Sequence, residues 1–194
     1  MRIENYVIII MLIFIIYIIL FVPLNFSEEK SNMLIVPVKA HIVVSEDFSS
    51  KRSPEEVRKI FDDANKIWMK AGINFRIDEI TYSYATENSV NDVLANKETQ
   101  FRKNLDFLKD YNPDKLNVYF VRNPSVNGIA YFEERIALIS DNVPYSHRTV
   151  AHELGHLLGL NHVNDPNRLM YEFSGNEEIT AEEIAIVRNN AGNF

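Results

Sequence analysis

The sequence contains no cysteine among its 194 residues. A disulfide framework, a zinc site built on thiolates and a cysteine nucleophile are therefore all excluded. The same absence excludes lipid attachment through a cysteine side chain. It does not indicate a cellular compartment, because a chain without cysteine is indifferent to redox conditions.

Positive charge is also scarce, since 20 Lys and Arg stand against 27 Asp and Glu and leave a formal net charge of −7. No basic stripe is visible and an acidic surface repels phosphate backbones, so we expect no nucleic-acid partner. Apolar residues make up 46% of the chain and include 12 Phe and 9 Tyr. The length and this composition fit one domain with a core of its own.

An uncharged apolar run lies near the N-terminus, at residues 6–22. As a helix with a rise of ~1.5 Å per residue it would span roughly 25 Å, close to the thickness of a bilayer core. The closer alternative is a cleaved signal peptide, but those have apolar stretches of ~7–15 residues and a small-residue cleavage pattern that residues 22–26 lack. We therefore expect an uncleaved transmembrane anchor that makes the membrane a partner of this protein.

This interpretation divides the chain into a flank at 1–5, the anchor or signal segment at 6–22, a linker at 23–33 and a folded domain at 34–194. Arg2 precedes the apolar run and favours an N-terminus on the inside. We expect a membrane-anchored protein with an extracytoplasmic domain, or a secreted one if the segment is cleaved.

Hydrophobic periodicity predicts an α+β pattern for the rest of the chain. Ser53-Pro54-Glu55-Glu56 combines a capping box with proline at the first helical position, and Gly72 ends the helix that it begins. Trp68 falls on the apolar face of this helix and is expected in the core, while Pro37 indicates an edge strand or a bulge. The expected strands are 34–44, 73–84, 116–121, 129–132 and 135–140. Further helices are expected at 99–109, at 146–158 with Ser146 as its cap, and after the capping box Thr180–Glu183.

Three of the five histidines fall within residues 152–162. His152 and His156 are four residues apart, so they share one face of a helix and can converge on one ion. Gly159 can adopt a positive φ, which allows a sharp turn that returns His162 to the same metal. Three neutral imidazoles at ~2.0–2.1 Å leave one position of a zinc tetrahedron open for water. Glu153 lies beside the ion, where it can take a proton from a water whose pKa zinc lowers toward ~7.

The alternative for this stretch is a core helix whose histidines align by chance, which would leave the polar face unexplained. We therefore expect one zinc ion per chain. His41, on the first strand, and His147, five residues before His152, are interpreted as structural or surface histidines. Asp165 has two open roles, a local turn with Pro166 or a bond that supports the ligand loop.

The stretch 152–162 matches the pattern H-E-x-x-H-x-x-G-x-x-H and so resembles the metzincin zinc metalloproteases. Leu169-Met170-Tyr171 resembles the methionine turn of the matrixin variant, and this resemblance implies that Met170 forms the apolar floor of the site. Gly128, Ile129, Ala130 and Tyr131 resemble the edge strand that such enzymes lay alongside an extended substrate. The resemblance implies a metzincin-like (zincin) domain with a mixed twisted sheet, a zinc-binding helix and a C-terminal helix.

The sequence also departs from parts of this family. Glu172 stands two residues after Met170, so the tyrosine ligand of astacin-like and serralysin-like members has no counterpart there. Without cysteine, the cysteine-switch latency of matrixins is impossible, and the short linker cannot hold a folded prodomain.

Together these features predict a zinc-dependent endopeptidase that acts on a peptide or protein, with Glu153 as the general base toward the zinc-bound water. The alternative from a different class is a membrane-anchored, zinc-containing binding module without turnover. Glu153 argues against it, because a structural zinc site has no need of that carboxylate. A zinc hydrolase for a non-protein amide also stays open, and nothing in the sequence indicates the oligomeric state.

Overall fold

A computed structural model describes residues 33–46, 48–85, 110–122, 127–173 and 175–194 of this protein. Within these residues no helix has both the length and the apolar character needed to cross a bilayer. The apolar run at 6–22, the flank and most of the linker, like the expected helix at 99–109, lie outside the described residues. The membrane anchor therefore stays a prediction.

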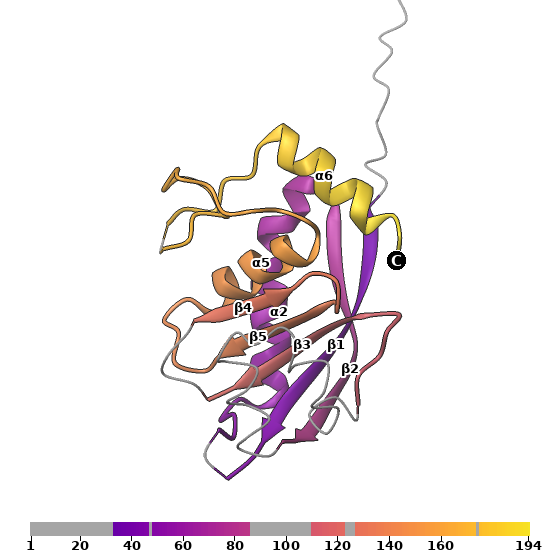
Figure 1. Ribbon diagram of the computed structural model, residues 1–194, viewed down its shortest axis with the longest axis vertical. Helices are drawn as coiled ribbons and strands as arrows, with labels where there is room; N and C mark the ends of the chain where they lie inside the picture. Colours follow the sequence, from indigo (N-terminus) through magenta and orange to yellow (C-terminus); the bar gives the residue numbers. More distant parts are fainter. Residues whose placement is uncertain (1–32, 47, 86–109, 123–126, 174) are drawn as a thin grey trace, which may run out of the picture. The chain divides into compact units, whose positions relative to one another are not determined.

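The described residues form a five-stranded sheet with the order β2-β1-β3-β5-β4 (Figure 1). Four strands run parallel, and β4 pairs antiparallel with β5 at one edge, which makes the sheet mixed as predicted. The strands are β1 Leu34–Val44, β2 Ile73–Tyr84, β3 Leu116–Val121, β4 Gly128–Tyr131 and β5 Ile136–Ser140.

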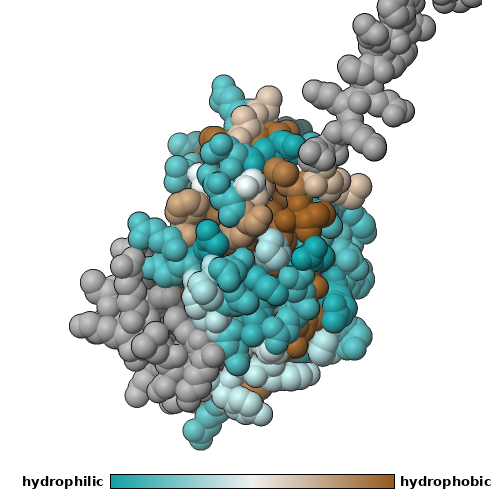
Figure 2. Space-filling model, turned by 90° about the vertical axis from the view of Figure 1, so that its right-hand side faces the viewer, coloured by the Kyte–Doolittle hydropathy of each residue, from teal (hydrophilic) through white to brown (hydrophobic). Residues whose placement is uncertain are grey.

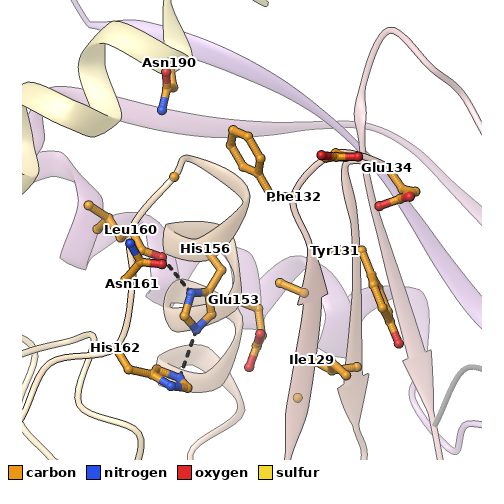
Figure 3. A pocket seen from close by; sticks show the side chains of 14 residues that line it. Ile129, Tyr131, Phe132, Glu134, Glu153, His156, Leu160, Asn161, His162 and Asn190 are labelled. Carbon is orange, nitrogen blue, oxygen red and sulfur yellow. Dashed lines mark hydrogen bonds between the residues drawn. The ribbon is translucent and has the colours of Figure 1, made fainter. Parts of the chain in front are cut away.

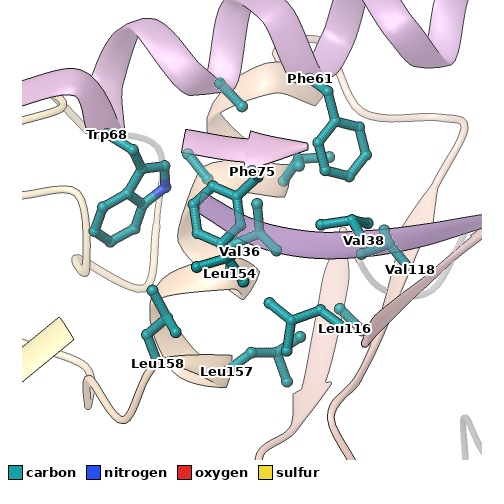
Figure 4. Packing of buried hydrophobic residues seen from close by; sticks show 14 of the residues in the cluster. Val36, Val38, Phe61, Trp68, Phe75, Leu116, Val118, Leu154, Leu157 and Leu158 are labelled. Atoms are coloured by element: carbon teal, nitrogen blue, oxygen red, sulfur yellow. The ribbon is translucent and has the colours of Figure 1, made fainter. Parts of the chain in front are cut away.

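The helices α2 Pro54–Trp68 and α5 Ser146–Leu157 contact each other and pack against the sheet, and α6 Ala181–Ala191 contacts β1 and the short 3-10 helix η1 Met69–Ala71. Side chains from these elements enclose the larger hydrophobic cluster, shown in Figure 4. Trp68 is fully buried there and meets Phe75 edge to face, at 5.9 Å between ring centroids, so its expected place in the core is confirmed. A smaller cluster around Tyr119, Val121 and Leu138 covers the other face of the sheet.

Local signals at three helix ends act as the sequence predicts. Ser53 and Thr180 each form a complete capping box with the glutamate three residues later, and Gly72 adopts the left-handed conformation, with φ of 66°. Pro37 does not lie in an edge strand, because β1 pairs with both neighbours. Pairing with β3 begins one residue later, at Val38, and the register with β2 shifts directly after it, so the bulge was the correct alternative.

The boundaries of three elements differ from the prediction. β4 begins at Gly128 and ends at Tyr131, one residue earlier than expected, because Phe132 and Arg135 close a turn through a backbone hydrogen bond of 3.1 Å. Arg135 has a φ of 56°, so β5 starts after it. The prediction that Ser146 caps α5 is wrong: Ser146 is the first helical residue, and its hydroxyl bonds Arg52 and the Val143 carbonyl instead.

Figure 2 shows one face of the domain, on which hydrophilic residues predominate and the more extended hydrophobic areas lie in the upper half. Most large apolar side chains of the described residues are buried in the two clusters.

Candidate metal centre

The three motif histidines converge in space. The Nε2 atom of His152 lies 3.2 Å from the Nε2 atoms of both His156 and His162, and the last two are 3.1 Å apart. Among the described residues this is the one group of three or more His, Asp or Glu side chains whose donor atoms lie close enough to hold a metal ion. His152 is buried, His156 is half-buried and His162 is exposed, so the triad opens to solvent on one side.

Backbone carbonyls orient two of the rings. His152 Nδ1 lies 2.8 Å from the Leu169 oxygen, and His156 Nδ1 lies 2.7 Å from the Leu160 oxygen. A carbonyl oxygen only accepts, so each Nδ1 carries the hydrogen and each Nε2 presents its lone pair to the centre of the triad. Burial lowers the pKa of His152 to about 4, against a smaller opposing effect of the Leu169 bond, and also lowers the pKa of His156. Both rings are therefore neutral near pH 7, the form that binds a metal.

The residues present fit a zinc ion. Three facing lone pairs repel one another unless a cation lies between them. Tetrahedral zinc with bonds of ~2.0–2.1 Å separates its nitrogen ligands by about 3.3–3.4 Å, close to the spacing of the three Nε2 atoms.

Gly159 makes the return of His162 possible. Its φ is 89°, a conformation that favours glycine, and the chain turns there at the end of α5. Leu160 N donates to the Gly155 carbonyl at 3.0 Å, and Asn190 Nδ2 donates to the Leu158 carbonyl at 2.9 Å, which closes the turn from two sides. A side chain at Gly159 would also strike Asn190, at 2.5 Å from its Nδ2.

Glu153 lies between α5 and the edge strand β4, as Figure 3 shows. It is 5% exposed, and burial raises the pKa of its carboxyl to about 8 in the metal-free protein. A cation at the neighbouring histidines would oppose that shift. The Glu153 side chain lines the same cleft as His156 and His162, and it is not a member of the histidine triad.

The turn that contains Met170 lies beneath the helix. Met170 is fully buried, and a Cβ added at Gly155 would lie 2.6 Å from its sulfur, so this glycine lets the turn approach α5 closely. The Met170 carbonyl accepts a hydrogen bond of 3.0 Å from Val163 N, which ties the turn to the loop carrying His162.

The edge strand β4 faces the triad across a cleft lined by residues of β4, the following turn, α5 and the His162 loop. Ser140 N donates to the Asn127 carbonyl at 2.9 Å. Bonded and non-bonded pairs alternate along an antiparallel ladder, so the N–H and C=O groups of Gly128 and Ala130 point away from β5, to the outer edge. Ile129 and Tyr131 bond β5, and their side chains point away from α5 (Figure 3).

The other singled-out residues lie elsewhere. His41 is fully buried and bonds Ser83 and Asn117, while His147 lies 3.3 Å from Glu177 near the surface. Asp165 is exposed and accepts a hydrogen bond of 3.0 Å from Asn167 N, which is the turn role of its two alternatives.

Sequence reasoning missed Arg148. Its guanidinium donates to the carbonyls of Leu169 at 3.0 Å and Tyr171 at 3.2 Å, and its Nε donates to Asn176 at 3.3 Å. Arg148 thereby fastens the methionine turn to α5 and shares the Leu169 oxygen with His152. Arg148 lies one helical turn before His152, and this position could have indicated a role near the site. The sequence did not show which carbonyls it contacts, because they lie more than 20 residues away.

Comparison with known proteins decides the family. The family model described as Matrixin matches residues 41–188. The chain belongs to the matrixin family of metzincin zinc metalloproteases. Family membership indicates zinc as the metal for the histidine triad.

This matrixin is 26% identical over 143 residues to an interstitial collagenase of Sus scrofa and 25% identical over 143 residues to one of Equus caballus. Each match covers 72% of this chain but 29% of the relative, so the chain spans less than a third of the length of these curated relatives.

Two solved structures share the fold. Archaemetzincin from Methanopyrus kandleri matches with a TM-score of 0.53 and 17% identity, over 86% of this chain and 99% of that one. Metalloproteinase-II from Bacteroides fragilis matches with a TM-score of 0.50 and 15% identity, over 81% of this chain and 53% of that one. The expected metzincin-like fold is thereby confirmed.

Proposed function

We propose that this matrixin is a zinc-dependent endopeptidase in which His152, His156 and His162 hold one zinc ion and Glu153 is the general base. The observation that carries the proposal is the juxtaposition of three convergent Nε2 atoms with a buried carboxyl group and with β4, which among the described residues is an edge strand of the sheet. When bound, zinc supplies a Lewis acid that polarises the scissile carbonyl and acidifies water.

The protein's own residues then direct the proton. A carboxylate oxygen of Glu153 accepts a proton from the attacking water as the new C–O bond forms. The same carboxyl donates that proton to the amine nitrogen as the C–N bond breaks. Water and one peptide give a carboxylic acid and an amine, so the atoms balance without a further reactant.

The edge strand supports an endopeptidase over an exopeptidase. The outward N–H and C=O groups of Gly128 and Ala130 can bond an extended peptide that adds a strand to the sheet. Such binding uses backbone groups on both sides of the scissile bond and needs no chain terminus. Met170 provides the apolar floor beneath the histidines in this proposal.

A zinc-containing binding module without turnover is the weaker alternative. It leaves the buried Glu153 without a role, and it leaves unexplained why the histidine triad opens to a cleft.

The decisive experiment uses the 194-residue chain and a diverse peptide library, with cut sites identified by mass spectrometry. We expect internal cuts that stop on chelation and return when zinc is added back. A folded, zinc-loaded protein that cuts nothing would contradict the proposal, and removal of single terminal residues would contradict the endopeptidase assignment.

We also propose that the apolar run at 6–22 anchors this matrixin in a membrane with its catalytic domain outside the cytoplasm. The protein should remain with membranes after a carbonate wash, and protease added from outside should reach the domain. Recovery of a soluble form that begins after the run would instead indicate a cleaved signal peptide.

A further inference from the structure

Gly128, the first residue of β4, lies directly against the side chain of Glu153. A Cβ atom built on Gly128 would lie 2.5 Å from Glu153 Oε1, 2.8 Å from its Cγ and 2.9 Å from its Cδ. Atoms that are not bonded to each other do not approach so closely, so any side chain at this position displaces Glu153. The 5% exposure of Glu153 shows how tightly the strand and α5 enclose it.

The backbone at this position does not itself require glycine. Gly72 and Gly159 are the glycines with positive φ among the described residues, and Gly128 is not one of them. Alanine can adopt the conformation of Gly128 without entering the left-handed region. What the position needs is therefore the missing side chain, and the group that occupies the vacated space is the Glu153 carboxylate.

The same residue meets the substrate in the function proposed above. The N–H and C=O groups of Gly128 point to the outer edge of β4, where an extended peptide would pair. The strand that aligns the scissile bond and the carboxylate that moves the proton thus touch at one residue.

We propose that Gly128 is a positioning residue that sets the location of the Glu153 carboxylate relative to the bound peptide. The inference rests on the proposed function. It assigns the contact between α5 and β4 a role in catalysis beyond packing. The three atoms nearest to the added methyl group of Gly128→Ala all belong to the Glu153 side chain and none to the backbone, so we expect the clash to be relieved by a shift of that side chain.

Gly128→Ala should lower kcat by about 10²-fold, the effect of misplacing a catalytic group by about 1 Å. KM should change little, because the backbone groups that pair with the peptide remain. The variant should remain folded with the zinc content of the wild type, and its Tm should fall modestly because a methyl group is added to a packed site. The matched control is Gly192→Ala, where a Cβ meets its nearest neighbours at an ordinary 3.5 Å and all four quantities should be unchanged.

Glu153→Asp distinguishes positioning from a general disturbance of the strand. Aspartate is one methylene shorter and leaves room for the alanine methyl group. In the Gly128→Ala background this second change should therefore cost much less than in the wild type, or restore part of kcat. A structure of metal-free Gly128→Ala should show the Glu153 carboxylate displaced, a readout that needs no activity.

Several results would overturn the inference: a kcat for Gly128→Ala within twofold of the wild type, a loss of zinc or of folding with it, or strict additivity with Glu153→Asp. In each case a wild type that cleaves peptides leaves the proposed function intact. A wild type that cleaves nothing defeats the proposed function itself, and the position of Glu153 in the variant structure still tests the contact.

Discussion

Buried histidines lie on both faces of the sheet, and their ring nitrogens face different partners. On the face away from the helices, His41 Nδ1 lies 2.9 Å from the Ser83 hydroxyl, and its Nε2 lies 3.2 Å from Asn117 Oδ1. Its ring stacks on Tyr119, with centroids 4.1 Å apart. On the helix side, His152 and His156 bond carbonyls through Nδ1 only, and their Nε2 atoms face each other and His162.

This difference separates a scaffold histidine from a ligand better than burial does. His41 is more buried than His152, yet both of its nitrogens have polar partners within the protein, so no cation is needed. The triad directs three lone pairs into one space, an arrangement that a cation stabilises. The predictions below test this comparison, beginning with the largest expected effect.

Replacing a triad member should remove metal and activity together. We expect His156→Ala to lower zinc from about one equivalent per chain to near zero and to abolish peptide cleavage. Its Tm in the presence of zinc should fall, because metal that binds only the folded state stabilises it. Metal analysis, peptide cleavage and thermal unfolding measure the three effects. Treating the wild type with a chelator should reproduce them, and a variant that keeps its zinc would contradict the ligand assignment.

Replacing the base should separate activity from metal. Glu153→Gln keeps the shape of the side chain but cannot accept the proton, so cleavage should fall by about 10²–10⁴-fold. Zinc content should stay unchanged, because the carboxylate lies beside the triad. Glu55→Gln, on the exposed side of α2, is the control and should cleave like the wild type. Equal activity of wild type and Glu153→Gln would show that another group takes the proton.

Replacing His41 should lower stability but leave zinc binding and peptide cleavage intact. His41→Phe keeps a ring to stack on Tyr119 but deprives Ser83 and Asn117 of a partner, so the free energy of unfolding should fall by about 1–3 kcal/mol. The folded fraction should still bind one zinc and cleave peptides. Denaturant unfolding and metal analysis provide the measurements. If zinc binding were lost while the fold persisted, the division between the two histidine groups would be wrong.

The sequence predicted the parts of this protein that depend on neighbouring residues. Three helix ends depend on contacts within a few residues, namely the capping boxes at Ser53 and Thr180 and the stop at Gly72. The sequence around each of them is therefore sufficient to predict it. The spacing of His152, His156 and His162 is equally local, because one helix and one glycine turn determine it.

Contacts between segments that are far apart in the chain could not be predicted from the sequence. The support from Arg148 to the methionine turn spans 21 residues to Leu169, and the contact between Gly128 and Glu153 joins a strand to a helix. The use of the Ser146 hydroxyl depends on Arg52, 94 residues earlier, which explains why the capping prediction failed there. For His41 the sequence left a structural or a surface role open, because its partners come from β2 and β3.

Acid should lower the free energy of unfolding through the buried His41. Burial lowers the pKa of His41 to about 4 from an ordinary value of 6.5, with Lys39 lowering it further and the Asn117 bond raising it. Below pH 6.5 the His41 imidazole becomes protonated in the unfolded chain but stays neutral in the folded protein until the pH approaches 4. The free energy of unfolding should therefore fall as the pH drops from 6.5 toward 4, with a slope approaching about 1.4 kcal/mol per pH unit.

Comparing metal-free wild type with metal-free His41→Phe isolates this contribution, because the triad titrates in both. The wild type should lose more stability than the variant between pH 6.5 and 4, and the two slopes should match below pH 4. Parallel profiles over the whole range would contradict the neutral, buried state of His41.

The smallest effect should come from the histidine that belongs to neither group. His147 lies at the start of α5, about one third exposed, and its Nε2 is 3.3 Å from Glu177 Oε1. A partly solvated pair of this kind contributes roughly 0–1 kcal/mol, because water screens the charges and the side chains lose freedom in forming it. His147→Ala should therefore change the free energy of unfolding by less than about 0.5 kcal/mol, as is usual for surface substitutions. Zinc content and peptide cleavage should match the wild type, since the ring lies outside the triad although it shares a helix with His152 and His156. A clear loss of zinc in this variant would mean that helix position alone, rather than the direction of the Nε2 atoms, governs metal binding.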